Sequence, residues 1–344
     1  DYQPLTRRRQ TLTQKAAHGG DMYTFFTAIH TRFPALFINF ADGRQACRPR
    51  RRSPRQHHEG LRLTIKHTVM KLRKTIAAMA VALCCATASA QTDSTLSING
   101  SMGKLAARLQ LPVIKPGEKC HMVILCHGFT GDMNGSLFDN ITSRLNEYGI
   151  GVLRFDFNGH GRSEGDFVNM TVPNEIDDAM AVISFVRNLP TTADISLLGH
   201  SQGGVVAAMT AGRLGSGVVR SVVLMAPAAV LRDDALRGNT MGAMYDPWHL
   251  PEYIALPSGH KLGRAYVQTA LDLPIYDTAA RFGGPALVIH GMADRVVPYT
   301  YGQRFSRVMP ECSITLIPGE DHSFTRNTEY AALLAADWLA KTLK

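Results

Sequence analysis

The chain has 344 residues, of which 45% are hydrophobic, and its formal net charge is +9. This length and composition allow a large buried core and one or two domains. The charge is uneven, because residues 1–90 hold 16 Lys and Arg against 4 Asp and Glu, whereas residues 91–344 hold 21 against 24. The main part of the chain is therefore mildly acidic, which excludes a basic nucleic-acid-binding surface as the basis of its function.

Residues 1–69 are rich in arginine, show no sustained hydrophobic period and contain the run RPRRRSPR at 48–55. This composition is typical of a disordered segment. We expect it to be upstream sequence without a function. The alternative is a basic arm that binds nucleic acid, although charge runs are usually only solvated.

Residues 70–90 contain the three parts of a secretory signal peptide in order. A positive start (71–74) precedes an apolar stretch (76–85), and Ala-Ser-Ala at 88–90 matches the small-residue cleavage pattern. The apolar stretch is too short to span a bilayer. We therefore expect an exported mature protein that begins at residue 91 and is periplasmic or secreted. The alternative is a short amphipathic helix of a folded domain.

The mature part keeps three cysteines, Cys120, Cys126 and Cys312. The first two flank a predicted strand and would lie roughly 20 Å apart if extended, which is too far for a disulfide. An odd number of cysteines without tight spacing is neither a disulfide framework nor a metal site. We expect free buried thiols and no metal; whether Cys312 pairs with another cysteine stays open.

From about residue 95, short runs rich in Val, Ile and Leu alternate with amphipathic stretches. The runs predict buried strands at 121–126, 152–157, 195–198, 221–225, 286–290 and 313–317. The stretches between them predict helices near 137–148, 175–188, 202–213, 299–309 and 325–342. An antiparallel pair at 95–100 and 104–112 precedes this series. The alternation predicts an α/β fold, a mostly parallel twisted sheet with helices on both faces.

One region interrupts the alternation, between the predicted strands at 221–225 and 286–290. It has about 55 residues, with four prolines and four tyrosines between residues 245 and 276. A plain crossover in a compact sheet is much shorter. We expect residues 229–280 to form an inserted cap after the sixth strand, within one domain that spans 91–344.

A G-x-S-x-G pattern, Gly199-His200-Ser201-Gln202-Gly203, follows a predicted strand and opens a predicted helix. This is the pattern of a nucleophile elbow. The tight turn strains the backbone at the serine, and small neighbours let the chain segments pass closely. The context predicts that Ser201 is an exposed nucleophile.

A serine hydroxyl needs a base to become an effective nucleophile. Asp294 and His322 each follow a predicted strand, and the chain order Ser201, Asp294, His322 suits side chains at the carboxyl ends of one parallel sheet. We therefore predict that His322 is the general base and that Asp294 orients its ring. Asp321 is an alternative orienting acid, but adjacent residues rarely face each other in the required way.

The developing oxyanion requires two preorganised N–H donors. The first strand of the parallel set ends in His127-Gly128-Phe129-Thr130-Gly131, whose glycines let the backbone curl toward the nucleophile. We assign the donors to the N–H groups of Phe129 and Gln202. His127 and His160 are expected to serve structure instead.

Five motifs, HGFTG, DFNGHGRSEG, GHSQGG, HGMADRVVP and GEDHSF, together resemble the α/β-hydrolase superfamily across residues 95–344. More narrowly, the chain resembles bacterial feruloyl (cinnamoyl) esterases. The resemblance implies a serine esterase that needs no metal or cofactor. It also implies a substrate in which ferulic or p-coumaric acid is esterified to plant cell-wall arabinose, with the cap shaping the acyl pocket and binding the ring hydroxyl.

The residues of the predicted cap are compatible with that substrate. Aromatic and methionine side chains would line a flat apolar slot, and Asp246, Tyr266 or Gln268 would reach a phenol. The candidate substrate contacts are Tyr245, Asp246, Trp248, Tyr266 and Gln268. In the alternative interpretation, Trp248 and the methionines Met241 and Met244 form a small core of the cap.

Three hypotheses for the function follow. The first is a secreted serine esterase that acts through an acyl-enzyme on feruloyl or p-coumaroyl esters, free or linked to polysaccharide. The second is a general short-acyl carboxylesterase or acyl-peptide hydrolase on the same triad, because a fold does not name a substrate. The third is a non-catalytic binding protein, which a fluorophosphonate that failed to label Ser201 would support. Nucleic acid and a stable membrane span after signal removal are not expected as partners, and the oligomeric state is open.

Overall fold

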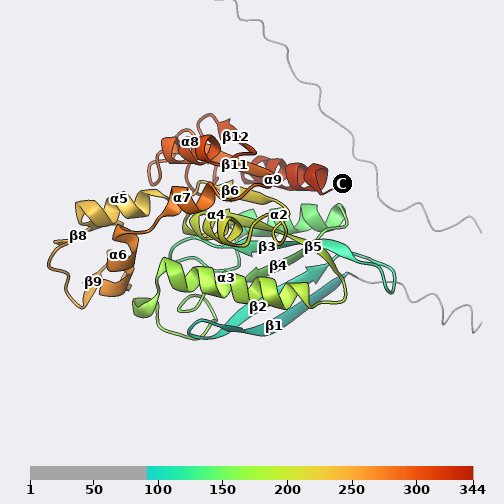
Figure 1. Ribbon diagram of the computed structural model, residues 1–344, viewed down its shortest axis with the longest axis horizontal. Coiled ribbons are helices and arrows are strands. Elements are labelled where there is room, and N and C mark those ends of the chain that lie inside the picture. Colours follow the sequence, from blue (N-terminus) through green and yellow to red (C-terminus); the bar gives the residue numbers. More distant parts are fainter. Residues whose placement is uncertain (1–90, 344) are drawn as a thin grey trace, which may run out of the picture. The chain divides into compact units, whose positions relative to one another are not determined.

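The computed structural model of the protein describes residues 91–343 (Figure 1). The predicted upstream segment 1–69 and signal peptide 70–90 lie outside the described residues, so both stay predictions. Within residues 91–343, no helix has the length and apolar character needed to cross a membrane.

The main sheet has eight strands in the order β1-β2-β4-β3-β5-β6-β11-β12. The pairs β1–β2 and β2–β4 are antiparallel, and every later pair is parallel. The predicted mostly parallel sheet with an antiparallel pair before it is therefore confirmed. The strands are β1 (Thr92–Gly100), β2 (Gly103–Leu111), β3 (Cys120–Cys126), β4 (Gly151–Phe155), β5 (Thr192–His200), β6 (Val222–Met225), β11 (Ala286–Gly291) and β12 (Cys312–Ile317).

Side chains along each buried strand alternate between the two faces of the sheet, so both faces are apolar. Helices cover both of them. On β3, Ile124 packs into the same core as α3 and α4, whereas its neighbours Val123 and Leu125 pack with α2 and α9. The first face carries α3 (Val172–Arg187), α4 (Gln202–Leu214) and α8 (Tyr299–Val308), and the second carries α2 (Ser136–Glu147) and α9 (Thr328–Thr342). The expected helices are thus present.

Two of these helices begin where the sequence offers a capping side chain. The Thr171 hydroxyl accepts the Asn174 N–H at the start of α3, and the Asn327 side chain accepts the Tyr330 N–H at the start of α9. Each cap satisfies a backbone donor that has no partner within its helix, and is worth about 1 kcal/mol.

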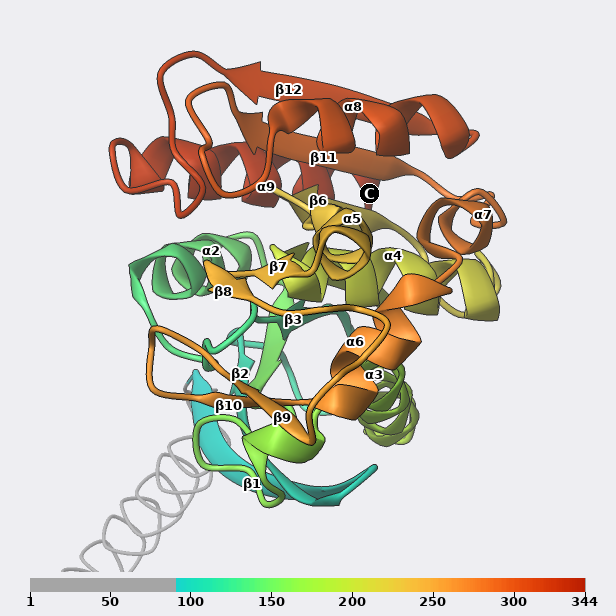
Figure 2. The ribbon, with the colours of Figure 1, turned by 90° about the vertical axis from the view of Figure 1, so that its left-hand side faces the viewer.

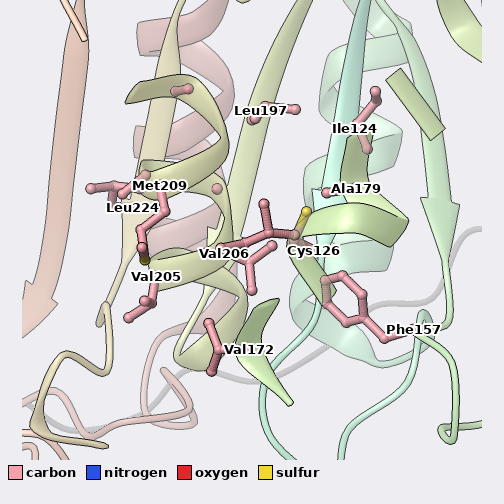
Figure 3. Packing of buried hydrophobic residues seen from close by; sticks show 14 of the residues in the cluster. Ile124, Cys126, Phe157, Val172, Ala179, Leu197, Val205, Val206, Met209 and Leu224 are labelled. Carbon is pink, nitrogen blue, oxygen red and sulfur yellow. The ribbon is translucent and has the colours of Figure 1, made fainter. Parts of the chain in front are cut away.

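The larger core lies between the sheet and α3 and α4 (Figure 3). Ile124, Leu197 and Leu224 come from three neighbouring strands and are fully buried, as are Val205 and Met209 of α4. Burial of each such side chain stabilises the fold by about 1.5–3 kcal/mol. This packing holds α4 under the carboxyl ends of β3 and β5, where the candidate site lies.

The chain between β6 and β11 forms its own small elements. They are α5 (Val230–Arg237), β7 (Asn239–Thr240), β8 (Ala243–Met244), β9 (Tyr253–Ala255), β10 (Lys261–Gly263), α6 (Arg264–Leu271) and α7 (Ile275–Ala279). The strands pair as two short antiparallel ribbons, β7 with β8 and β9 with β10. Figures 1 and 2 show α5, α6 and these ribbons together at one end of the molecule. By contrast, α7 packs on α4, where a Cβ at Gly212 would stand 2.0 Å from the Thr278 carbonyl oxygen.

The three cysteines of the described residues are free thiols. Cys120 and Cys126 are buried, as expected, and Cys312 is partly exposed. Burial raises the pKa of all three thiols, so they stay protonated and unreactive at neutral pH.

Candidate active site

Ser201 occupies the turn between β5 and α4 in a strained backbone conformation, with φ 56° and ψ −122°. Such a conformation is costly for a residue with a Cβ and persists only where its surroundings hold it. Here the Ser201 N–H donates to the Met225 carbonyl of β6, at 2.9 Å, and the Ser201 carbonyl accepts the Ala228 N–H, at 3.0 Å. The neighbouring strand and the loop after it therefore fix the turn.

Glycines allow the turn to pack against the neighbouring strand. A Cβ at Gly203 would stand 2.2 Å from the Cys126 carbonyl oxygen, at the end of β3. A Cβ at Gly128, in the loop after β3, would stand 2.9 Å from the Ser201 Cβ. The two glycines thus bring the β3 loop into contact with the serine.

The three residues of the predicted triad form one hydrogen-bonded chain. The His322 Nε2 lies 2.9 Å from the Ser201 Oγ, and the His322 Nδ1 lies 2.7 Å from the Asp294 Oδ2. Asp294 follows β11 and His322 follows β12, the parallel strand beside it. With Nδ1–H donating to the carboxylate, Nε2 is free to accept the serine proton.

The Asp294 carboxylate is fully buried but has four donors. Its Oδ1 accepts the N–H groups of Val296 and Val297, at 2.8 Å each, and its Oδ2 accepts from His322 and from His290, the latter at 3.1 Å. Burial alone would raise the pKa of Asp294, but the hydrogen bonds from His290 and His322 hold it well below its ordinary range. The carboxylate is therefore ionised at any pH near neutrality.

The loop that carries His322 is held from two sides. The carboxylate of Asp321, the alternative orienting acid, accepts from the backbone of Ser323 and Thr325 and from the Thr325 hydroxyl, so it faces away from the imidazole. On the other side, the His200 Nε2–H donates to the His322 carbonyl oxygen at 2.9 Å. Burial lowers the pKa of His200 to about 4, so this donor is neutral.

The backbone N–H groups of Phe129 and Gln202 have no acceptor among the described residues. Within residues 91–343, neither group donates a hydrogen bond to another protein atom, and both residues border the same cavity as Ser201. Free donors beside a nucleophile are what an oxyanion hole requires. Both groups are therefore available as donors beside Ser201, and their assignment to an oxyanion hole stays a prediction.

His127 and His160 serve structure, as expected. The His127 Nε2 accepts the Phe157 N–H at 3.0 Å, and its Nδ1 lies 2.8 Å from the Gly128 carbonyl oxygen. The His160 Nδ1 contacts the Asn158 carbonyl oxygen at 3.2 Å. Burial lowers the pKa of both imidazoles to about 4. His127 also borders the groove beside Ser201, but both of its ring nitrogens are engaged with the backbone.

Ser201 lies between two cavities of different character. The first, of about 370 Å³, lies under α5 and α6 and is walled by the Phe129 and Tyr266 rings and by aliphatic side chains such as Val230 and Leu231. The second, of about 600 Å³, is a groove on the His322 side. Its polar lining residues include Asp132, Asn134, Ser136, Ser323 and Thr325.

Comparisons with known proteins agree with this geometry. Residues 117–249 match the Hydrolase_4 family, described as serine aminopeptidase, S33. A structure of Est1E from Butyrivibrio proteoclasticus with ferulic acid bound is 30% identical, with a TM-score of 0.69 over 72% of this chain and 98% of that chain. The chain belongs to the α/β-hydrolase superfamily.

Two further relatives extend the comparison. A monoacylglycerol lipase of Mycolicibacterium smegmatis is 26% identical to this α/β hydrolase over 286 residues, 73% of this chain and 99% of that protein. Mouse α/β hydrolase domain-containing protein 10, at 20% identity and a TM-score of 0.57, covering 73% of this chain and all of that one, shares the fold. The protein is therefore a hydrolase of the esterase and lipase type.

The structure corrects most of the predicted substrate contacts. Tyr266 lines the first cavity and donates its hydroxyl to the Gln202 Oε1 at 2.8 Å, but none of the other four residues lines it. Gln268 is exposed, because it lies two positions after Tyr266 on α6 and so on the other side of that helix. Trp248 is 76% exposed, which places it away from the cavity wall.

The remaining two predicted contacts are engaged locally. The Asp246 carboxylate accepts a hydrogen bond from the Trp248 N–H and contacts the His249 ring. The Tyr245 hydroxyl forms a hydrogen bond with the Thr240 Oγ1 at 2.7 Å. The alternative, in which Trp248 and the methionines form a core, is also wrong, because Met241 and Met244 are 54% and 73% exposed.

Several residues of the cavity were not singled out from the sequence. Asp234 and Arg237 of α5 line it, with Asn239 and Thr240 just after them. In the sequence, acidic and basic residues of a short amphipathic helix indicate a solvated face. These polar groups reach the cavity only because α5 packs next to Ser201 in the folded protein.

Buried polar groups also hold the Gln202 side chain. Its Nε2 donates to both carboxyl oxygens of Glu175, at 2.9 and 3.0 Å, while its Oε1 accepts from Tyr266. Burial raises the pKa of Glu175 well above its ordinary range. These contacts tie α3 and α6 to Gln202, the first residue of α4.

Gly203→Ala tests the close approach of the elbow to β3. The added Cβ meets a backbone carbonyl at 2.2 Å, so we expect a loss of unfolding free energy of about 1–3 kcal/mol, measured by urea denaturation. Gly217→Ala is the control, because nothing lies within 4 Å of a Cβ there. Equal stability of the two variants would contradict the proposed packing.

Proposed function

We propose that this hydrolase is an exported serine esterase that cleaves feruloyl and p-coumaroyl esters of plant cell-wall polysaccharide through an acyl-enzyme. The observation that carries the proposal is the chain Ser201–His322–Asp294, with two free N–H donors beside it and a cavity with aromatic walls next to the nucleophile. The similarity to Est1E, whose structure holds ferulic acid, supports the acyl group.

In the first step, the Ser201 Oγ attacks the ester carbonyl carbon while its proton moves to the His322 Nε2. Asp294, ionised and fixed by its donors, holds the ring in the productive tautomer and stabilises the imidazolium. The N–H groups of Phe129 and Gln202 donate hydrogen bonds to the carbonyl oxygen and so stabilise the negative charge that develops on it.

The tetrahedral intermediate then collapses. The bond from carbon to the leaving oxygen breaks, and His322 returns its proton to that oxygen, which releases the alcohol and leaves the acyl group on Ser201. Water repeats the sequence: His322 removes its proton, the hydroxide oxygen bonds to the acyl carbon, and the Ser201 Oγ leaves with the returned proton. The acid is the second product.

The cavity under α5 and α6 suits an aromatic acyl group with a polar substituent. The rings of Phe129 and Tyr266 are tilted at 52° with centroids 5.6 Å apart, and Val230 and Leu231 add aliphatic walls. Asp234 supplies a half-buried carboxyl that can accept a hydrogen bond from a ring hydroxyl. The Arg237 guanidinium lies 3.9 Å from this carboxyl, too far for a hydrogen bond. Among the described residues the carboxyl therefore has no hydrogen-bond partner, and an alkyl chain would bury it without one, which is unfavourable.

The groove on the other side of Ser201 suits a sugar as the leaving alcohol. Its wall carries carboxylate, amide and hydroxyl groups, from Asp132, Asn134, Ser136, Ser323 and Thr325. The carboxylate accepts hydrogen bonds, and the amide and hydroxyl groups both donate and accept them, as sugar hydroxyls do. Export, which the residue pattern at 70–90 favours, would bring the enzyme to polysaccharide outside the cytoplasm.

The first test compares methyl ferulate with p-nitrophenyl acetate and butyrate by kcat/KM. We expect methyl ferulate to be turned over efficiently, and Ser201→Ala to lower kcat by at least about 10⁴-fold without unfolding the protein. Ser184→Ala, at an exposed serine of α3, is the control. Turnover of the small activated esters alone would leave a general short-acyl carboxylesterase, and an active Ser201→Ala variant would exclude the mechanism.

The second test concerns Asp234, whose pKa burial raises to about 6. Above that pH the carboxyl is ionised and accepts more strongly, so the KM for methyl p-coumarate should fall as pH rises through 6, while that for methyl cinnamate, which lacks the hydroxyl, should not. Asp234→Asn should remove this pH dependence and raise the KM for p-coumarate about tenfold.

Asp272→Asn is the matched control for that experiment, because Asp272 is an exposed acid at the end of α6. If the KM ratio of the two esters is the same at pH 5 and pH 7 in the unaltered enzyme, Asp234 does not contact the ring hydroxyl.

A further inference from the structure

One buried histidine beside the site has no role in the mechanism above. His290, on β11, is fully buried, and its Nε2 lies 3.1 Å from the Asp294 Oδ2 and 2.9 Å from the Val297 carbonyl oxygen. Both neighbours are acceptors, so Nε2 must carry a proton. His290 is therefore a second imidazole donor to the same carboxylate oxygen that receives the His322 ring.

The opposite edge of the His290 ring is buried against a helix. Among the described residues, its Nδ1 is buried without a hydrogen-bond partner. A proton there would be an unsatisfied buried donor on a charged ring, which is costly. Gly302 of α8 packs against this edge, where a Cβ would stand 2.5 Å from Nδ1. The helix thus holds the ring in place.

We propose that His290 is a positioning residue that fixes the Asp294 carboxylate for His322. This inference rests on the proposed function, because it assigns Asp294 the orienting role. Val296 and Val297 hold Oδ1 through their N–H groups, but both lie within three residues of Asp294, on the same loop. His290 holds Oδ2 from the strand, so the carboxylate is anchored at both oxygens and cannot turn away from His322.

His290 also weakens the electrostatic effect of the Asp294 carboxylate on His322. A donor on Oδ2 draws off part of the negative charge that would otherwise act on the His322 Nδ1 proton. Without it, the imidazolium is stabilised more, and His322 becomes a usable base only at higher pH. The other titratable groups around His322 are His200, whose ring centroid lies 5.1 Å away, and Asp321, Arg295 and Arg326 of the adjoining cavity. Of these groups, His200 also interacts with His290, which contributes to the lowered pKa of the His200 imidazole.

The experiment measures the pH profile of kcat/KM on p-nitrophenyl butyrate, an activated ester that does not depend on feruloyl specificity. We expect His290→Leu to lower kcat about 10–100-fold, with little change in KM, and to move the acid limb upward by about half a pH unit or more. His290→Gln, whose amide nitrogen can reach the position of Nε2, should recover most of kcat and return the limb toward its original pH.

Matched variants separate this role from a purely structural one. His121→Leu removes another histidine–aspartate pair, with Asp194, at the start of β3 and so at the opposite end of the sheet, and should move neither kcat nor the limb. His290→Met, whose flexible chain fills irregular space, replaces the leucine variant if that one does not fold.

Three results would overturn the inference. One is an unchanged kcat and limb in the folded leucine or methionine variant. Another is a fall in activity that only tracks loss of folded protein. The third is a glutamine variant as impaired as leucine. Ser201→Ala and Asp294→Asn run in the same series, so that failure of the triad, seen as activity in those two variants, is distinguished from failure at His290 alone.

Discussion

The structure of the site depends on a negative charge that is buried. The Asp294 carboxylate has no exposed surface, and an isolated charge in such a place would be strongly unfavourable. Four N–H groups, two from its own loop and two from imidazoles, make it stable there. Each donor needs an accurate position, so the loop after β11, the loop after β12 and the end of β11 itself are fixed relative to one another.

The parallel sheet supplies that accuracy. Its strands end at one edge, and the register of β11 with β12 places Gly291 opposite Ile317, so that Asp294 and His322 follow within a few residues of the same level. The strained turn at Ser201 is tied to β6, which lies between β5 and β11. Nucleophile, base and carboxylate are thus positioned by one continuous hydrogen-bonded framework.

The sequence was informative where function and local structure share the same short stretch. The pattern around Ser201 predicts a turn between strand and helix because its glycines are needed for backbone contact, as the 2.2 Å approach at Gly203 shows. The alternation of strands and helices is likewise a local signal. The cap is different: nothing near Trp248 or Asp234 in the sequence tells that the first faces solvent and the second faces the cavity, because α5 and α6 are oriented by their packing on the domain. His290 reads as one more residue of a buried strand, and only its distance to Asp294 gives it a role.

In the proposed mechanism, Ser201 carries the acyl group between the two half-reactions. Acid quenching of the enzyme during turnover of methyl ferulate, followed by peptide mass spectrometry, detects such an intermediate. We expect a feruloyl ester on the peptide that contains Ser201. When the protein is acylated by an activated feruloyl ester, a His322 variant should hold more of this adduct, because it cannot activate water for deacylation. Turnover of methyl ferulate with no adduct on Ser201 in either protein would contradict this mechanism. So would an adduct on another residue that hydrolyses as fast as the enzyme turns over.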